Sequence, residues 1–252
     1  MKIKRLLSFL GIFTVVGMSG ILTLIFSPGL AFSKSYDYGQ CTIHSKRVVD
    51  QAAFNLAIDE AMQRLADSEL YDPEYHFDLL LADGHFYNTF DNALFGNWAV
   101  ARAIDNNVIL KKAVNEQAGT VANGSNEFEL AYVLAHEMVH CLQAYRFGKK
   151  TFNPFSPPPL WKLEGYPEYI ARSPDRAHSD YHLAKEITVF LERTTPDQAP
   201  HEIIQIGPKS STPFGYYKAL LLTSYLIEIE GMSYAQILEE TVEEASAYAN
   251  MM

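Results

Sequence analysis

Apolar residues recur every three or four positions over residues 45–66, and this spacing predicts a long amphipathic helix. The pattern then changes to short apolar runs. Residues 76–82 form one such run, which is typical of a strand. Two more, residues 98–104 and 108–114, flank Asp105-Asn106-Asn107 and predict a hairpin. The first half of the chain is therefore expected to contain one helix and about three strands.

A second strongly apolar helix is predicted over residues 127–146. Asn126 and Glu129 stand three positions apart before it, as in a capping box, and Gly148 is the expected stop. Residues 152–159 contain four prolines, which exclude a helix or a central strand there. This segment is expected to be a rigid connector.

Beyond residue 184 the pattern is mostly helical, and residues 214–229 carry it most clearly. The expected fold is α+β and predominantly helical, with a small N-terminal sheet and a helical C-terminal part. The chain has 252 residues, 48% of them hydrophobic, and neither repeats nor low-complexity tracts. One domain over residues 34–252 therefore follows the N-terminal segment.

The first 33 residues have the character of an export segment. Lys2, Lys4 and Arg5 precede an apolar run over residues 6–26, and small residues follow it up to Ser33. This is the pattern of a signal peptide cleavable after Ser33, although signal runs usually span roughly 7–15 residues. A run of 21 residues also matches the ~20 of a membrane span. Residues 1–33 are thus a signal peptide or an N-terminal anchor, and either one exports the body.

Charge and cysteine content narrow the function further. The formal net charge is −10 and no Lys/Arg cluster relieves it, which argues against nucleic-acid binding. Export would permit a disulfide between Cys41 and Cys141. The alternative is that Cys141 is a small buried hydrophobe.

The apolar helix over residues 127–146 carries three polar groups in the stretch A-H-E-M-V-H. His136 and His140 stand four positions apart, so both imidazoles can converge on one metal ion. Glu137 points to the side, where a carboxylate can reach a water without binding the ion. A buried, hydrogen-bonded histidine pair is the alternative.

A catalytic zinc ion needs a third protein ligand. Arg146 stands where a metzincin would have its third histidine, which excludes that class. Residues 160–172 read L-W-K-L-E-G-Y-P-E-Y-I-A-R and place Glu164 and Glu168 four positions apart, with Pro167 between them. Either the two glutamates form a solvated face, or one of them binds the ion. Pro167 is expected to be tolerated because Glu164 lies in the first helical turn.

This pair of motifs resembles the gluzincin metallopeptidases, the group of thermolysin and aminopeptidase N. The resemblance implies that Glu164 is the third zinc ligand and that Glu168 orients a ligand histidine. Residues 214–218, F-G-Y-Y-K, are similar to the Y-x-K stretch of the aminopeptidase N group. That similarity implies that Tyr216 donates to the oxyanion, with Tyr217 as its rival. Packing of both tyrosines on the core is the alternative.

The resemblance implies a zincin-like domain that binds Zn²⁺ and hydrolyses peptide bonds through a zinc-bound water. His136, His140 and Glu164 would hold the ion, and Glu137 would be the general base. A peptide or protein substrate would pair with an upstream strand, expected at residues 108–114. Two alternatives remain: a zinc hydrolase of a non-peptide amide or ester, and a catalytically inactive exported binding module. The membrane is a further partner if the N-terminal segment stays uncleaved.

Overall fold

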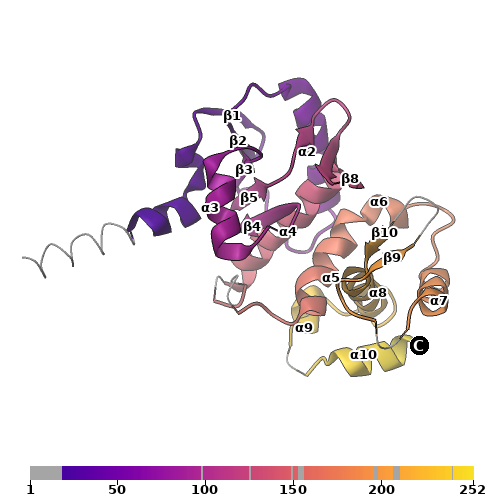
Figure 1. Ribbon diagram of the computed structural model, residues 1–252. Coiled ribbons are helices and arrows are strands. Elements are labelled where there is room, and N and C mark those ends of the chain that lie inside the picture. Colours follow the sequence, from indigo (N-terminus) through magenta and orange to yellow (C-terminus); the bar gives the residue numbers. More distant parts are fainter. Residues whose placement is uncertain are drawn as a thin grey trace, which may run out of the picture.

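The computed structural model describes residues 19–97, 99–124, 126–148, 150–152, 156–195, 198–206, 211–239 and 241–252. The fold is α+β, with more helix than strand. In Figure 1 the strands of the sheet gather in the first half of the chain, coloured indigo to magenta, whereas the orange and yellow C-terminal part is mostly helical. The expected class and the expected order of its parts are therefore confirmed.

A five-stranded mixed sheet forms the first half, in the order β1-β2-β3-β5-β4. β1 and β2 make an antiparallel hairpin, whereas β2, β3 and β5 run parallel. β4 returns antiparallel to β5 and ends the sheet as an edge strand. The strands are Lys34–Tyr38 (β1), Cys41–Ser45 (β2), Phe77–Leu81 (β3), Ala101–Ile104 (β4) and Asn107–Leu110 (β5).

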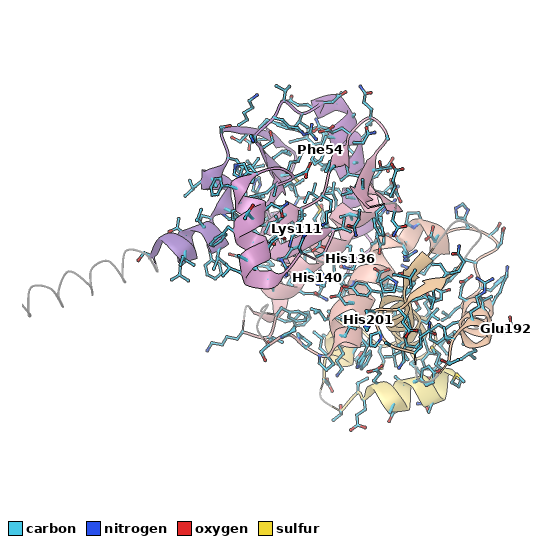
Figure 2. All side chains as sticks on the ribbon, in the orientation of Figure 1. Phe54, Lys111, His136, His140, Glu192 and His201 are labelled. Carbon is cyan, nitrogen blue, oxygen red and sulfur yellow. The ribbon has the colours of Figure 1, made fainter. Side chains whose placement is uncertain are left out.

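Helices cover both faces of this sheet. α2 (Gln51–Leu65) and α4 (Leu130–Phe147) pack with Leu79 and Val108 in the main core. Successive strand side chains point to opposite faces, so Leu80 and Ile109 instead form a second cluster with α3 (Phe86–Phe95). Lys111, which directly follows β5 and is labelled in Figure 2, is buried against Asp91 of α3 and ties that helix to the sheet.

Part of the N-terminal segment belongs to this second cluster. Residues 19–26 are helical, and Leu24 and Ile25 pack against the cluster with Phe32. The Phe32 ring stacks on His85 with 4.2 Å between centroids and 12° between planes. Residues 1–18 of the expected signal or anchor lie outside the described residues. Among those described, no helix has the length and apolarity that crossing a bilayer requires.

The second half is built around two helices, α5 and α8, that pack side by side. A three-stranded antiparallel sheet precedes α4, and a two-stranded one precedes α8. The elements are β6 (Val114–Asn115), β7 (Thr120–Asn123), β8 (Asn126–Glu129), α5 (Leu160–Ala171), α6 (Ser173–Arg176), α7 (Leu183–Arg193), β9 (Ile203–Gln205), β10 (Ser211–Pro213), α8 (Phe214–Glu228), α9 (Tyr234–Ile237) and α10 (Glu244–Met251).

Several predicted elements are confirmed with shifted bounds. The helix predicted over residues 45–66 begins at Gln51, because the side chain of Asp50 accepts a hydrogen bond from the Ala53 amide. The predicted hairpin is β4–β5, with Asp105 in the left-handed region at φ 59°. The first residue of its predicted strand, Trp98, lies outside the described residues. The strand β3 agrees closely with the predicted run over residues 76–82.

One expectation about local structure was wrong. Residues Asn126 to Glu129 form β8, which pairs with β7, so no capping box precedes α4. Pairing with β7 fixes the backbone there. The Glu129 carboxylate forms an ion pair with Arg64 and so does not cap the helix. The structure also decides between the two alternatives for the cysteines in favour of burial, because Cys41 in β2 and Cys141 in α4 are buried free thiols of the main core.

Candidate metal centre

α4 carries the two histidines. The helix begins at Leu130, directly after β8, and ends at Gly148, which adopts φ 88° as expected for a helix stop. His136 is buried, and His140 is half-buried one turn later. Both lie near the middle of the molecule in Figure 2, between the sheet and the helical half.

α5 carries the two glutamates. It begins at Leu160, so Glu164 lies in the second turn and Pro167 lies inside the helix. The expectation that Glu164 would occupy the first turn was therefore wrong. The helix tolerates its proline through a contact from α4, described below.

Close packing of α5 on α8 sets the position of Glu164. A β-carbon on Gly165 would lie 2.6 Å from the carbonyl oxygen of Ala219 and would overlap the hydroxyl of Thr223. Only glycine allows the two helices to approach this closely. The glycine of the E-G pair thus brings the Glu164 helix against the helix that carries Tyr216.

Three atoms from α4 and α5 converge. Nε2 of His136 and Nε2 of His140 are 3.2 Å apart. Oε2 of Glu164 lies 3.2 Å from the first nitrogen and 3.3 Å from the second. Among the described residues, these three side chains form the group whose ligand atoms lie close enough together to hold a metal ion.

The spacing fits a zinc ion. Ligand atoms about 2.05 Å from a tetrahedral ion stand roughly 3.3 Å from one another. Two imidazole nitrogens and one carboxylate oxygen are also a ligand set of catalytic zinc sites, which keep a fourth position open. The side chains of His136, His140 and Glu164 therefore meet both the distance and the chemistry that such an ion requires.

The pKa values of these side chains depend on one another's charges. Burial would lower the pKa of His136, but the carboxylates of Glu164 and Glu168 outweigh it and raise that pKa to about 10. Burial would raise the pKa of Glu164, but His140 and His136 outweigh it and hold that pKa well below its usual range. A cation is therefore favoured at this point, and a bound metal would take the place of the protons.

Glu168 lies beside Nδ1 of the His136 ring. Its Oε1 is 3.3 Å from Nδ1 of His136, close enough for an ion pair although the atoms are not aligned as a hydrogen bond. Tyr132 donates a hydrogen bond to Oε1, and Nε of Arg172 donates to Oε2 at 2.8 Å. Burial opposes ionisation, but Arg172 and His136 outweigh it and lower the pKa of Glu168 to about 2. The carboxylate is thus charged and held beside the His136 imidazole, where it could orient that ring.

Glu137 lies beside the trio on α4 and is half-buried. Burial raises the pKa of its carboxyl, while His136 and His140 act in the opposite direction. The charge of Arg102 on β4 also lowers this pKa. The Glu137 carboxyl is therefore close enough to both the edge strand and the candidate metal centre to be affected by their charges. A carboxylate with a raised pKa is suited to accept and return a proton near neutral pH.

The two adjacent tyrosines of α8 lie on different sides. Tyr216 stacks on His136, and burial raises its pKa, followed by the charges of Glu164 and Glu137. Tyr217 packs against Phe190 instead, among the core side chains. The structure therefore brings Tyr216, and not Tyr217, to the metal centre.

The expected substrate strand is corrected. Residues 107–110 form β5, which pairs with β3 on one side and β4 on the other, so it has no free edge. β4 ends the sheet instead. An extended peptide can add only to an edge strand.

Sequence reasoning did not single out Tyr132 and Arg172, which hold Glu168. Each stands one helical turn from a residue of the motif: Tyr132 before His136, and Arg172 after Glu168. That i, i+4 spacing is the signal that could have identified them. No protein-family model, no curated protein and no solved structure matches this chain.

Proposed function

We propose that this chain is a zinc-dependent hydrolase of the zincin type that cleaves peptide bonds. The observation that carries the proposal is the convergence of Nε2 of His136, Nε2 of His140 and Oε2 of Glu164 at 3.2–3.3 Å from one another. When bound, a zinc ion supplies a Lewis acid and makes water a nucleophile at neutral pH.

Two side chains beside the trio supply the remaining chemistry. Glu137 would take a proton from the attacking water and return it to the leaving amine. The Tyr216 hydroxyl would donate a hydrogen bond to the oxygen on which negative charge develops. Glu168 would keep the His136 ring in its binding orientation, with Tyr132 and Arg172 holding the carboxylate.

The substrate would be an extended segment of a peptide or protein. β4 supports this part of the proposal, because it is an edge strand and its Arg102 lies close enough to affect Glu137. Backbone hydrogen bonds to β4 would hold the segment independently of most of its side chains. Export through residues 1–33 would place this activity outside the cytoplasmic membrane, either tethered or released.

Metal analysis of the purified full chain tests the proposal. One zinc ion per chain is expected, and His140→Ala and Glu164→Ala should each lose it. His178→Ala is the matched control, since His178 is an exposed histidine outside this trio. Undiminished zinc in either ligand variant would overturn the assignment.

A second measurement separates hydrolysis of peptides from the two alternatives. The zinc-loaded chain is incubated with a mixed peptide library and with simple ester and amide substrates. Cleavage of peptides supports the proposal. Cleavage of the esters or simple amides alone would make the chain a non-peptide hydrolase, and zinc binding without any hydrolysis would make it a binding module.

A further inference from the structure

Gln143 of α4 is fully buried and contacts three groups. Its Oε1 lies 2.7 Å from Nδ1 of His140. Its Nε2 lies 3.0 Å from the carbonyl oxygen of Leu163 and 2.7 Å from the hydroxyl of Tyr234. The side chain therefore touches both a metal-binding histidine and the backbone of the helix that carries Glu164.

The Leu163 carbonyl needs this contact because of Pro167. In a helix, the carbonyl of residue 163 would accept from the amide of residue 167, and proline has no N–H to donate. A buried carbonyl left without a donor costs about 1–3 kcal/mol. The Gln143 amide supplies the missing donor from α4, which explains how α5 keeps a proline in its interior.

The same contact fixes which way the amide points. A backbone carbonyl can only accept, so the atom facing Leu163 must be the NH₂ group. The contact with Tyr234 indicates the same orientation of the amide. The Tyr234 hydroxyl donates to the Lys162 carbonyl at 2.8 Å, so its oxygen can accept from the Gln143 NH₂ group. Oε1 must then face His140, and Nδ1 of that ring must be the donor. Nε2 of His140 is left with its lone pair toward His136 and Glu164.

We propose that Gln143 is a positioning residue of the metal centre. It fixes His140 in the tautomer whose Nε2 binds metal, and it joins α4 to α5 through the carbonyl that Pro167 leaves without a helical donor. The inference rests on the proposed zinc function for its first half. The second half concerns the protein fold alone and is tested separately.

The test uses Gln143→Met, which keeps the length of the side chain and removes both hydrogen-bonding groups. Zinc affinity should fall roughly 10- to 100-fold, as for other residues that orient a ligand histidine. The melting temperature of the metal-free full chain should fall by roughly 3–10 °C. Gln63→Met is the control, because Gln63 is an exposed glutamine of α2, and it should change neither quantity.

A second variant separates positioning from packing. Pro167→Ala restores an N–H at residue 167, which can donate to the Leu163 carbonyl. Added to Gln143→Met, it should recover the lost melting temperature and leave the zinc affinity low, because His140 still lacks its acceptor. Recovery of both quantities would show that Gln143 acts only through the fold and would overturn the positioning role.

The tautomer can be read without zinc. In ¹⁵N spectra of the metal-free chain, the His140 ring should carry its proton on Nδ1, and Gln143→Met should abolish that preference. An unchanged tautomer together with unchanged zinc affinity would overturn the inference while leaving the zinc site intact. A chain that binds no zinc would instead overturn the proposed function, and the tautomer and melting measurements would still decide this one.

Discussion

The Tyr216 ring stacks on the His136 ring, with 6.2 Å between centroids and 21° between planes. Its neighbour Tyr217 points elsewhere and donates a hydrogen bond to Oε2 of Glu186 on α7 at 2.6 Å. Adjacent residues of a helix differ in direction by about 100°, given 3.6 residues per turn. The two hydroxyls therefore form a natural pair of test and control.

Tyr216→Phe should lower kcat and kcat/KM by similar factors, roughly 100- to 1,000-fold, because an oxyanion donor acts only as charge develops. Zinc content should not change, since the hydroxyl is not a ligand. Tyr217→Phe should leave turnover near wild type and cost about 1 kcal/mol of stability through the lost bond to Glu186. Steady-state kinetics on both variants decide the matter, and a reversed pattern would transfer the role to Tyr217.

Glu137→Gln should remove most hydrolytic activity and retain zinc. The substitution keeps the shape of the side chain and removes its ability to accept a proton. Zinc content and melting temperature are measured beside activity, with Glu127→Gln as the control because Glu127 is an exposed carboxylate of β8. Loss of zinc in Glu137→Gln would place this carboxylate among the ligands.

Gly165→Ala should separate α5 from α8. The added β-carbon meets the Ala219 carbonyl, which is backbone and cannot rotate away. We expect a loss of about 1–3 kcal/mol in unfolding free energy and weaker zinc binding, because Glu164 moves with its helix. Gly20→Ala is the control, since its β-carbon would meet nothing within 4 Å. Wild-type stability and zinc affinity in Gly165→Ala would contradict this account of the packing.

Residues 19–33 should contribute to stability. Removing them exposes the second cluster, which Leu24, Ile25 and Phe32 cover. A chain that begins at Lys34 should therefore melt at least several degrees below one that begins at Ser19. Equal melting temperatures would show that the contact contributes nothing. Mass spectrometry of the N-terminus of the exported protein would then tell whether it begins at Lys34 or keeps the whole segment over residues 1–33.

Local patterns predicted the parts of this structure that depend on local sequence. Apolar periodicity identified α4 and α8, and the run after residue 76 identified β3. The proximity of His136 and His140 was predictable because helical spacing alone brings them to one face. The prediction that Glu164 joins the two histidines required the resemblance to a known family, because the packing of α5 against α4 is a tertiary property.

Long-range contacts decided the remaining parts. Asn126 and Glu129 look like a cap, but pairing with β7 makes them a strand. The sequence of α3 mixes apolar and polar side chains. This segment forms a helix because it packs on the sheet, with contacts such as the ion pair between Asp91 and Lys111. Pro167 reads as a helix breaker, and its compensation comes from a side chain 24 positions earlier that no local pattern could indicate.

The link from Gln143 to Pro167 also constrains how the two positions can change over time. With proline at 167, residue 143 must both donate to α5 and accept from His140, and a neutral amide meets both demands. Once alanine replaces the proline, α5 no longer needs a donor from residue 143, and the demand for an amide at that position is weaker. The two sites should therefore covary among divergent copies of this fold, with proline paired to an amide and substitution of the amide confined to copies that lack the proline.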